Sequence, residues 1–166
     1  MKKLTILFAL VLTLLALTTI LVNRHEGGVY RLEVSGDSIS DMVRRGNYDW
    51  TNSNINDDYF TADAPHEANI IIFKHFGEDM STKAVLKALD DDGLRPATMS
   101  ELLELGICYP ELQKQFPIVA LGSISQDPYG DRSVGFLYSV DGQRELGLDW
   151  IDDDWYDHFR FAAVRK

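Results

Sequence analysis

The sequence of 166 residues contains a single cysteine, Cys108. One thiol excludes an internal disulfide and any metal site built from several cysteines. We interpret Cys108 as a buried free thiol beneath a helix, with an intermolecular disulfide as the alternative. A domain without internal disulfides depends on its hydrophobic core, and a chain of this length can supply one.

Motifs for nucleotide chemistry are missing as well. The chain has neither a G-x-G-x-x-G pattern nor a P-loop, and no Ser-His-Asp order stands out. It also lacks internal repeats and low-complexity tracts. His66 and His75 stand alone, and His75 alternates with apolar residues, which indicates a structural role. These absences favour one non-repetitive domain and give no support to nucleotide chemistry.

Basic residues are scarce after Val22. Beyond that point the chain has 14 Lys and Arg against 26 Asp and Glu, a formal charge of −12. This charge repels phosphate backbones and anionic lipid surfaces, so we expect no nucleic-acid partner. A cationic ligand, a divalent metal or a basic protein fits the charge better.

The first 22 residues form a different kind of segment. Lys2 and Lys3 precede 19 uncharged residues, Leu4 to Val22, and a helix of that length spans roughly 28 Å, close to the hydrocarbon thickness of a bilayer. The run has no small-x-small cleavage site, which favours a retained signal-anchor over the alternative, a cleaved signal peptide. The lysines orient the downstream chain out of the cytoplasm. We therefore expect a signal-anchor or signal peptide at 1–22 with membrane attachment through 4–22, a linker at 23–28, and one extracytoplasmic domain, anchored or secreted, at 29–166.

The pattern of residues 29–166 predicts an α+β domain. Alternating apolar residues indicate a strand at 29–34, and a short helix follows at 38–45, with Gly46 as its stop. The polar segment 47–65 predicts an ordered loop held by its aromatic residues. A buried strand is expected at 69–76.

Two further helices and a series of strands complete the prediction. One helix begins at Ser81 or Thr82 and ends before Gly93, and the next begins with the capping box Thr98-Met-Ser-Glu101. From 116 onward the chain reads as antiparallel strands with a hairpin turn at Asp141-Gly142 and a last strand at 159–164. We expect the two helices to pack on a mainly antiparallel sheet in which the first and last strands pair.

Two segments resemble a known fold. Residues 84–105 read Ala-Val-Leu-Lys-Ala-Leu-Asp-Asp-Asp-Gly-Leu-Arg-Pro-Ala-Thr-Met-Ser-Glu-Leu-Leu-Glu-Leu. They are similar to the first helix, glycine turn and Glu-bearing second helix of the C-type-lectin-like fold. The ending Arg160-Phe-Ala-Ala-Val-Arg-Lys166 is similar to its closing strand. The resemblance covers roughly 69–166 and is strongest to the bacterial branch, which includes formylglycine-generating-enzyme-like domains and the variable target proteins of diversity-generating retroelements.

Two departures limit what this resemblance implies. The formylglycine-generating enzymes that this fold resembles use two cysteines and copper, whereas Cys108 is the single cysteine of this chain. Calcium-dependent sugar-binding lectins use Glu-Pro-Asn or Gln-Pro-Asp and Trp-Asn-Asp triplets, and none occurs here. We expect neither activity, because a fold can persist without either function.

The densest aromatic and acidic stretch lies just before the last strand. In retroelement target proteins this position resembles the variable, ligand-facing patch, and large aromatic rings suit an interface. The candidate ligand-binding residues are Asp149, Asp152, Asp153, Asp154, Trp155, Tyr156, Asp157 and His158. We place the neighbouring Trp150 in the core, because it shares a strand face with Leu146 and Leu148.

Other interpretations of this acidic stretch stay open. It could be a solvated loop, or it could bind Ca²⁺ through its oxygens, although the glycine and the glutamate of an EF-hand are missing. We expect no catalytic residue and no cofactor. The sequence favours non-catalytic recognition of an extracellular protein or surface ligand. The alternatives are a carboxylate-using hydrolase of the cell envelope, which needs two carboxyl groups about 5–10 Å apart across a cleft, and a structural envelope protein.

Overall fold

The structure, a computed structural model, describes residues 30–166, with the backbone alone at 67–69. The expected signal segment at 1–22 and the linker at 23–28 lie outside these residues. None of the helices between 30 and 166 has both the length and the apolar character needed to cross a membrane.

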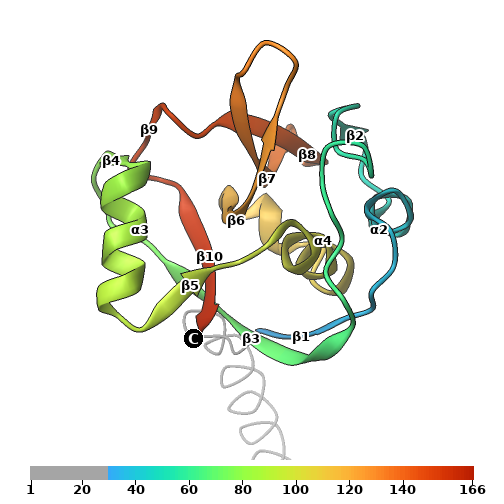
Figure 1. Ribbon diagram of the computed structural model, residues 1–166, viewed down its shortest axis with the longest axis horizontal. Coiled ribbons are helices and arrows are strands. Elements are labelled where there is room, and N and C mark those ends of the chain that lie inside the picture. Colours follow the sequence, from blue (N-terminus) through green and yellow to red (C-terminus); the bar gives the residue numbers. More distant parts are fainter. Residues whose placement is uncertain (1–29) are drawn as a thin grey trace, which may run out of the picture.

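The part of the chain that is described folds as α+β (Figure 1). Its helices are α2 (Ile39–Gly46), α3 (Thr82–Asp91), α4 (Met99–Cys108) and a short 3-10 helix, η1 (Leu112–Lys114). Its strands are β1 (Tyr30–Val34), β2 (Trp50–Thr51), β3 (His66–Lys74), β4 (Met80–Ser81), β5 (Leu94–Pro96), β6 (Ile118–Gln126), β7 (Arg132–Val140), β8 (Gln143–Trp150), β9 (Asp154–Trp155) and β10 (Arg160–Arg165). The α+β class expected from the sequence is therefore confirmed.

One mixed sheet organises the domain. Its strands follow the order β1-β3-β10-β6-β7-β8-β2, with β5 paired to β10 as well, and β4 and β9 form a separate ribbon. The β10–β6 and β2–β8 pairs are parallel, and the other pairs are antiparallel.

The predicted pairing of the first and last strands is wrong. Strand β3 lies between β1 and β10 and pairs with both. Tyr30 of β1 pairs with Ile71, and Ala163 of β10 pairs with the next residue, Ile72. Because β3 has nine residues, its first part can hold β1 while its last part holds β10.

A hydrophobic core lies on each face of the sheet. Helices α2 and α4 cover one face, where Leu102 of α4 packs with Ile118 and Leu137. Helix α3 covers the other face, where Val85 packs with Val119 and other apolar residues. Adjacent residues such as Ile118 and Val119 enter opposite cores because side chains alternate along a strand.

The predicted helix starts are confirmed by side-chain caps. Ser38 caps α2, Ser81 caps α3, and Thr98 caps α4 in a complete capping box with Glu101. Helix α3 ends before Gly93, as predicted, and Gly93 has a left-handed backbone with a φ of +69°. These local signals fixed the helix boundaries because each cap satisfies backbone N–H groups within one turn.

Helix α2 ends at Gly46, the predicted stop, but Gly46 is not the residue with a left-handed backbone. It is the last helical residue, and Asn47 takes the left-handed conformation with a φ of 47°. A Cβ atom at Gly46 would lie 2.3 Å from the Tyr48 ring. Glycine is required here for the close approach of that ring rather than for backbone freedom.

Cys108 is exposed, so its predicted burial is wrong. It is the last residue of α4, whereas the apolar residues that enter the core, Leu102, Leu103 and Leu105, stand earlier in the helix. Its neighbours Ile107 and Tyr109 pack against this core, so the thiol lies on the solvent side of the last turn of α4.

Replacement of Tyr48 by phenylalanine tests a buried polar atom. The Tyr48 hydroxyl has no hydrogen-bond partner among the described residues, and its burial raises the pKa of the phenol. Since an unsatisfied buried hydroxyl costs about 1–2 kcal/mol, we expect Tyr48→Phe to keep or raise stability by up to that amount. Urea unfolding of the full chain in non-ionic detergent measures the change. A loss above about 1 kcal/mol would reveal a hydroxyl partner.

Candidate functional site

The predicted ligand residue Trp155 does not face solvent. Its side chain is 2% exposed, and its indole Nε1 donates a hydrogen bond of 2.8 Å to the Thr82 hydroxyl at the start of α3. The ring also packs edge-on against Phe159 and Phe161. Pairing of β9 with β4 turns Trp155 inward and leaves its neighbours outside. The expectation that Trp155 belongs to an exposed patch is therefore wrong.

Most of the other predicted residues are exposed. These are Asp152, Asp153, Asp154, Tyr156, Asp157 and His158. The segment is fixed to its surroundings: the Asp157 backbone N–H donates to the Asp79 carboxylate at 3.0 Å, and its carbonyl lies 2.8 Å from His75 Nε2. In the described chain no cluster of three or more His, Cys, Asp and Glu side chains is suited to hold a metal ion.

Asp149 lies apart from that exposed group. It pairs with Val134 across β7 and β8, on the sheet face that α3 covers. Its half-buried carboxylate accepts a hydrogen bond of 2.9 Å from the Trp150 backbone N–H. Burial, helped by the nearby charge of Asp153, raises the pKa of Asp149.

Trp150 is 59% exposed, so its predicted place in the core is wrong. Leu146, on the same strand face, is fully buried as expected, but helix α4 covers only part of this face. Met99, the first residue of α4, contacts the sheet at Gly135, which pairs with Leu148. Trp150 is two residues beyond Leu148 on the same face of β8, so its side chain lies past the end of the helix.

A small polar hollow lies beside Trp150, and we call it the Trp150 pocket. Its volume is about 180 Å³. Its lining residues come from the loop after β2, the β6–β7 hairpin and the end of β8. They are Asn52, Asn54, Tyr59, Ser125, Asp127, Asp131, Ser133, Leu148 and Trp150. The pocket thus combines hydroxyl, amide and carboxylate groups with an exposed indole.

Strand register brings the sheet part of the pocket together. Ser125 of β6 pairs with Ser133 of β7, and Ser133 pairs with Trp150 of β8. Directly paired residues project from the same face of a sheet. The two hydroxyls and the indole therefore stand side by side across three strands.

Backbone hydrogen bonds fix the two loops of the pocket. The Asn52 N–H donates to the Leu146 carbonyl at 2.9 Å, next to the parallel β2–β8 pair. In the β6–β7 turn, Asp127 Oδ1 accepts the N–H groups of Tyr129 and Asp131 at 2.8 and 3.0 Å. Both loops are therefore held in place before any ligand arrives.

A second hollow, the aromatic groove, lies on the opposite face of the sheet. It has a volume of about 350 Å³, and Phe116, Phe136, Tyr138 and Phe159 line it together with His158. Phe136 and Tyr138 stack at 4.5 Å over Gly147, whose missing Cβ leaves room for them. Burial and a hydrogen bond to Glu145 raise the pKa of Tyr138 to about 12. Of the predicted ligand residues, His158 borders this groove.

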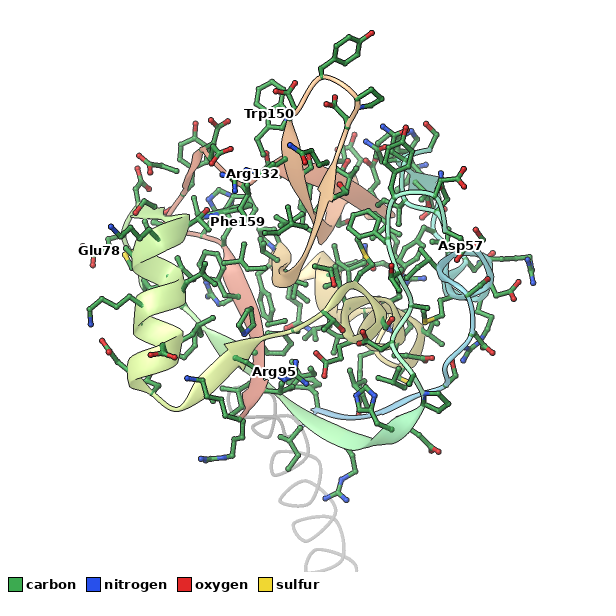
Figure 2. All side chains as sticks on the ribbon, viewed as in Figure 1. Asp57, Glu78, Arg95, Arg132, Trp150 and Phe159 are labelled. Carbon is green, nitrogen blue, oxygen red and sulfur yellow. The ribbon has the colours of Figure 1, made fainter. Side chains whose placement is uncertain are left out.

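The Trp150 pocket lies far from both ends of the domain. The described chain begins and ends at the lower side of the view, where β1 and the end of β10 lie on either side of β3, and the β6–β7 hairpin points upward (Figure 1). Figure 2 shows Trp150 at the upper end and Arg95 near the lower end. The pocket therefore opens at the end opposite to residue 30.

Sequence reasoning missed the residues that line the pocket with Trp150. The signals in the sequence are the Asn- and Asp-rich segment 47–65, predicted as an ordered loop, and the run Asp127-Pro-Tyr-Gly-Asp131, whose Pro and Gly are typical of a turn. Their meeting depends on the pairing of β2 with β8, strands that are far apart in sequence. Comparison of the chain with known protein families, curated proteins and solved structures found no match.

Proposed function

We propose that this chain is a non-catalytic recognition protein that presents the Trp150 pocket outside the cytoplasm, tethered through residues 4–22. The observation that carries the proposal is the exposed indole of Trp150 beside a preformed polar pocket. Trp, Tyr, Ser and Asn are the residues that recognition surfaces use most, because rigid rings give contact area and small polar groups adapt their hydrogen bonds.

A C-type-lectin-like fold over 69–166 is part of this proposal. The α3–β5–α4 unit, with its capping box at Thr98, supports it. The closing strand β10 also pairs with β3, the strand that precedes these helices. In a retroelement target protein the exposed residues Tyr156, Asp157 and His158 would be display positions just before the closing strand.

The position of the pocket suits a tethered receptor. Tyr30 and Ala163 pair with adjacent residues of β3, so both ends of the domain lie together. The β6–β7 hairpin lies at the far end (Figure 1). An anchor that precedes residue 30 would leave the pocket directed away from the membrane.

The carboxylates of the pocket suit binding better than hydrolysis. Asp127 and Asp131 are its two acids. Asp127 Oδ1 already accepts two backbone N–H groups of its own turn, which is a structural use of the carboxylate. A glycosidase needs one acid free to donate a proton and a second to act as a base or nucleophile.

Selection of ligands from displayed-peptide and glycan libraries tests the proposal. The bait is the full chain in nanodiscs of neutral lipid. We expect selected ligands to lose about 30-fold in affinity on Trp150→Ala, because a central Trp contributes at least about 2 kcal/mol to an interface. Tyr156→Ala is the matched control: its ring is also exposed, but it lies in the acidic segment.

Two outcomes would contradict this assignment. If Tyr156→Ala weakens binding and Trp150→Ala does not, recognition uses the acidic segment predicted from the sequence. If neither library yields a ligand that depends on the folded chain, recognition is the wrong function and a structural envelope protein is favoured.

A further inference from the structure

We infer that the Trp150 pocket binds an organic cation, namely the guanidinium or ammonium head of an Arg or Lys side chain on a partner protein. This inference rests on the proposed function and names the class of ligand. It follows from the charge of the lining, the exposed indole and the size of the pocket.

The described residues that line the pocket include two acids and no basic residue. Asp127 and Asp131 contribute two carboxylates. The basic residue nearest to them in sequence, Arg132, pairs with Asp152 at 2.5 Å. Because side chains alternate along β7, Arg132 and Ser133 project from opposite faces, so this guanidinium does not neutralise the pocket.

Trp150 supplies the aromatic partner that an organic cation requires. The negative face of an indole ring attracts a cation, and the attraction strengthens when water is excluded from the contact. The indole stands on the same face as Ser125 and Ser133. A cation beside it would meet the ring on one side and hydroxyl or carboxylate oxygens on the other.

The size of the pocket favours a head group over a complete small molecule. Its volume of about 180 Å³ is below the range of about 300–1,000 Å³ that is usual for small-molecule sites. The head of a long side chain needs little room, because its stem stays outside with the partner. A metal ion fits less well, since the described residues offer no cluster of three or more metal-binding side chains.

The negative charge of the whole domain also favours a cationic ligand. Residues 23–166 carry a formal charge of −12. Such a field speeds association with basic partners at low ionic strength. The pocket would then supply the specific contact after this general attraction.

Binding of matched peptides tests the inference. The probe is an acetylated, amidated, dye-labelled Gly-Ser-Arg-Ser-Gly peptide, and the receptor is the full chain in neutral nanodiscs. We expect the Arg peptide, and its Lys counterpart, to bind at least about tenfold more tightly than the peptides with citrulline or acetyl-lysine at the same position, a difference of about 1.4 kcal/mol. Fluorescence anisotropy measures each affinity.

Paired variants separate the pocket from the general charge. Asp131→Asn should weaken binding of the Arg peptide about tenfold, because it removes a charged partner of the cation. Asp141→Asn removes the same charge from the exposed β7–β8 turn, where a φ of 51° suits asparagine. This control should change the affinity less than about twofold.

Three results would overturn the inference. If the citrulline peptide binds as tightly as the Arg peptide and still requires Trp150, the proposed recognition function stands but its ligand is neutral. If Asp131→Asn and Asp141→Asn weaken the affinity for the Arg peptide equally, the peptide is held by the general negative charge and not by the pocket. Displacement of the peptide by millimolar Ca²⁺, together with Ca²⁺ binding in its absence, would assign the pocket to a metal ion.

Discussion

Arg144→Met is expected to lower the free energy of unfolding by about 3–4 kcal/mol, because several charge-assisted hydrogen bonds are lost together. The Arg144 guanidinium donates to the carbonyls of Gly46 and Gly106 at 2.8 and 2.7 Å. It also lies 4.8 Å from the centre of the Tyr48 ring. One side chain of β8 therefore joins the C-terminal ends of α2 and α4.

The C-terminal ends of α2 and α4 explain why the loss of stability should be large. Gly46 is the last residue of α2, and Gly106 lies in the last turn of α4. Carbonyl groups at these positions have no partner within the helix, and the helix dipole adds a partial negative charge there. Without the guanidinium, both ends lose a hydrogen-bond donor and a compensating positive charge.

Arg160→Met is the matched control for this prediction. Arg160 also lies over an aromatic ring, at 5.1 Å from the centre of Phe116, but within residues 30–166 its guanidinium donates only to the nearby carbonyl of His158. We expect a loss of about 1 kcal/mol or less for this control. Arg144→Lys should fall between the two, because an ammonium keeps the charge but not the planar fork. Equal losses for Arg144→Met and Arg160→Met in urea unfolding would contradict the proposed role.

Arg95→Met is expected to lower the free energy of unfolding by about 3 kcal/mol, the lower end of the range for breaking a buried ion pair, since Arg95 itself is partly exposed. Its guanidinium makes two parallel bonds of 2.9 and 2.8 Å to the Glu101 carboxylate. That carboxylate has 0% of its side chain exposed. Removal of the guanidinium takes two charge-assisted bonds from this buried carboxylate, while His66 Nε2 stays 3.7 Å from Glu101 Oε1.

The capping box makes the Arg95–Glu101 pair part of the start of α4. Glu101 Oε2 also accepts the Thr98 N–H at 2.8 Å, and the Thr98 hydroxyl accepts the Glu101 N–H. The bonds with Glu101 raise the pKa of Arg95, in keeping with a stable pair. The same carboxylate thus caps α4 and holds β5 beside it.

A double-mutant cycle measures this pair. Arg95→Met combined with Glu101→Gln should recover about 2 kcal/mol relative to the sum of the single changes, because the double variant no longer buries a carboxylate that has lost its guanidinium. The surface pair Lys87–Asp91, formed by two largely exposed side chains, supplies the control, and Lys87→Met should leave the urea midpoint unchanged. Additive effects of Arg95→Met and Glu101→Gln would show that the pair is uncoupled.

Local chemistry made the helices and hairpins predictable. The caps at Ser38, Ser81 and Thr98, and the Asp141-Gly142 turn, act within a few residues, so the sequence displays both partners of each interaction. The position of β3 between β1 and β10 has no such signal. It depends on the pairing of β3 with β10, whose paired residues are about 90 positions apart in the sequence.

The location of the candidate region was also predictable from the sequence, whereas the exposure of its two tryptophan rings was not. The sequence marked the region around Trp150 and Trp155 as aromatic and acidic, but it assigned the two rings to the wrong environments. Trp155 is buried because β9 pairs with β4 and because Thr82 accepts its N–H. Trp150 is exposed because α4 ends its contact with the sheet at Gly135.

The sequence by itself determined the α+β class, the helix starts, the hairpin and the acidic charge of the domain, since composition and short-range spacing decide these properties. Only the tertiary structure decided which side of each strand is covered, and therefore which aromatic side chain faces solvent. It also joined the loop after β2 to the β6–β7 hairpin and so formed the Trp150 pocket. The physical reason is that burial of a strand residue depends on the partner that packs on its face, and that partner can come from any part of the chain.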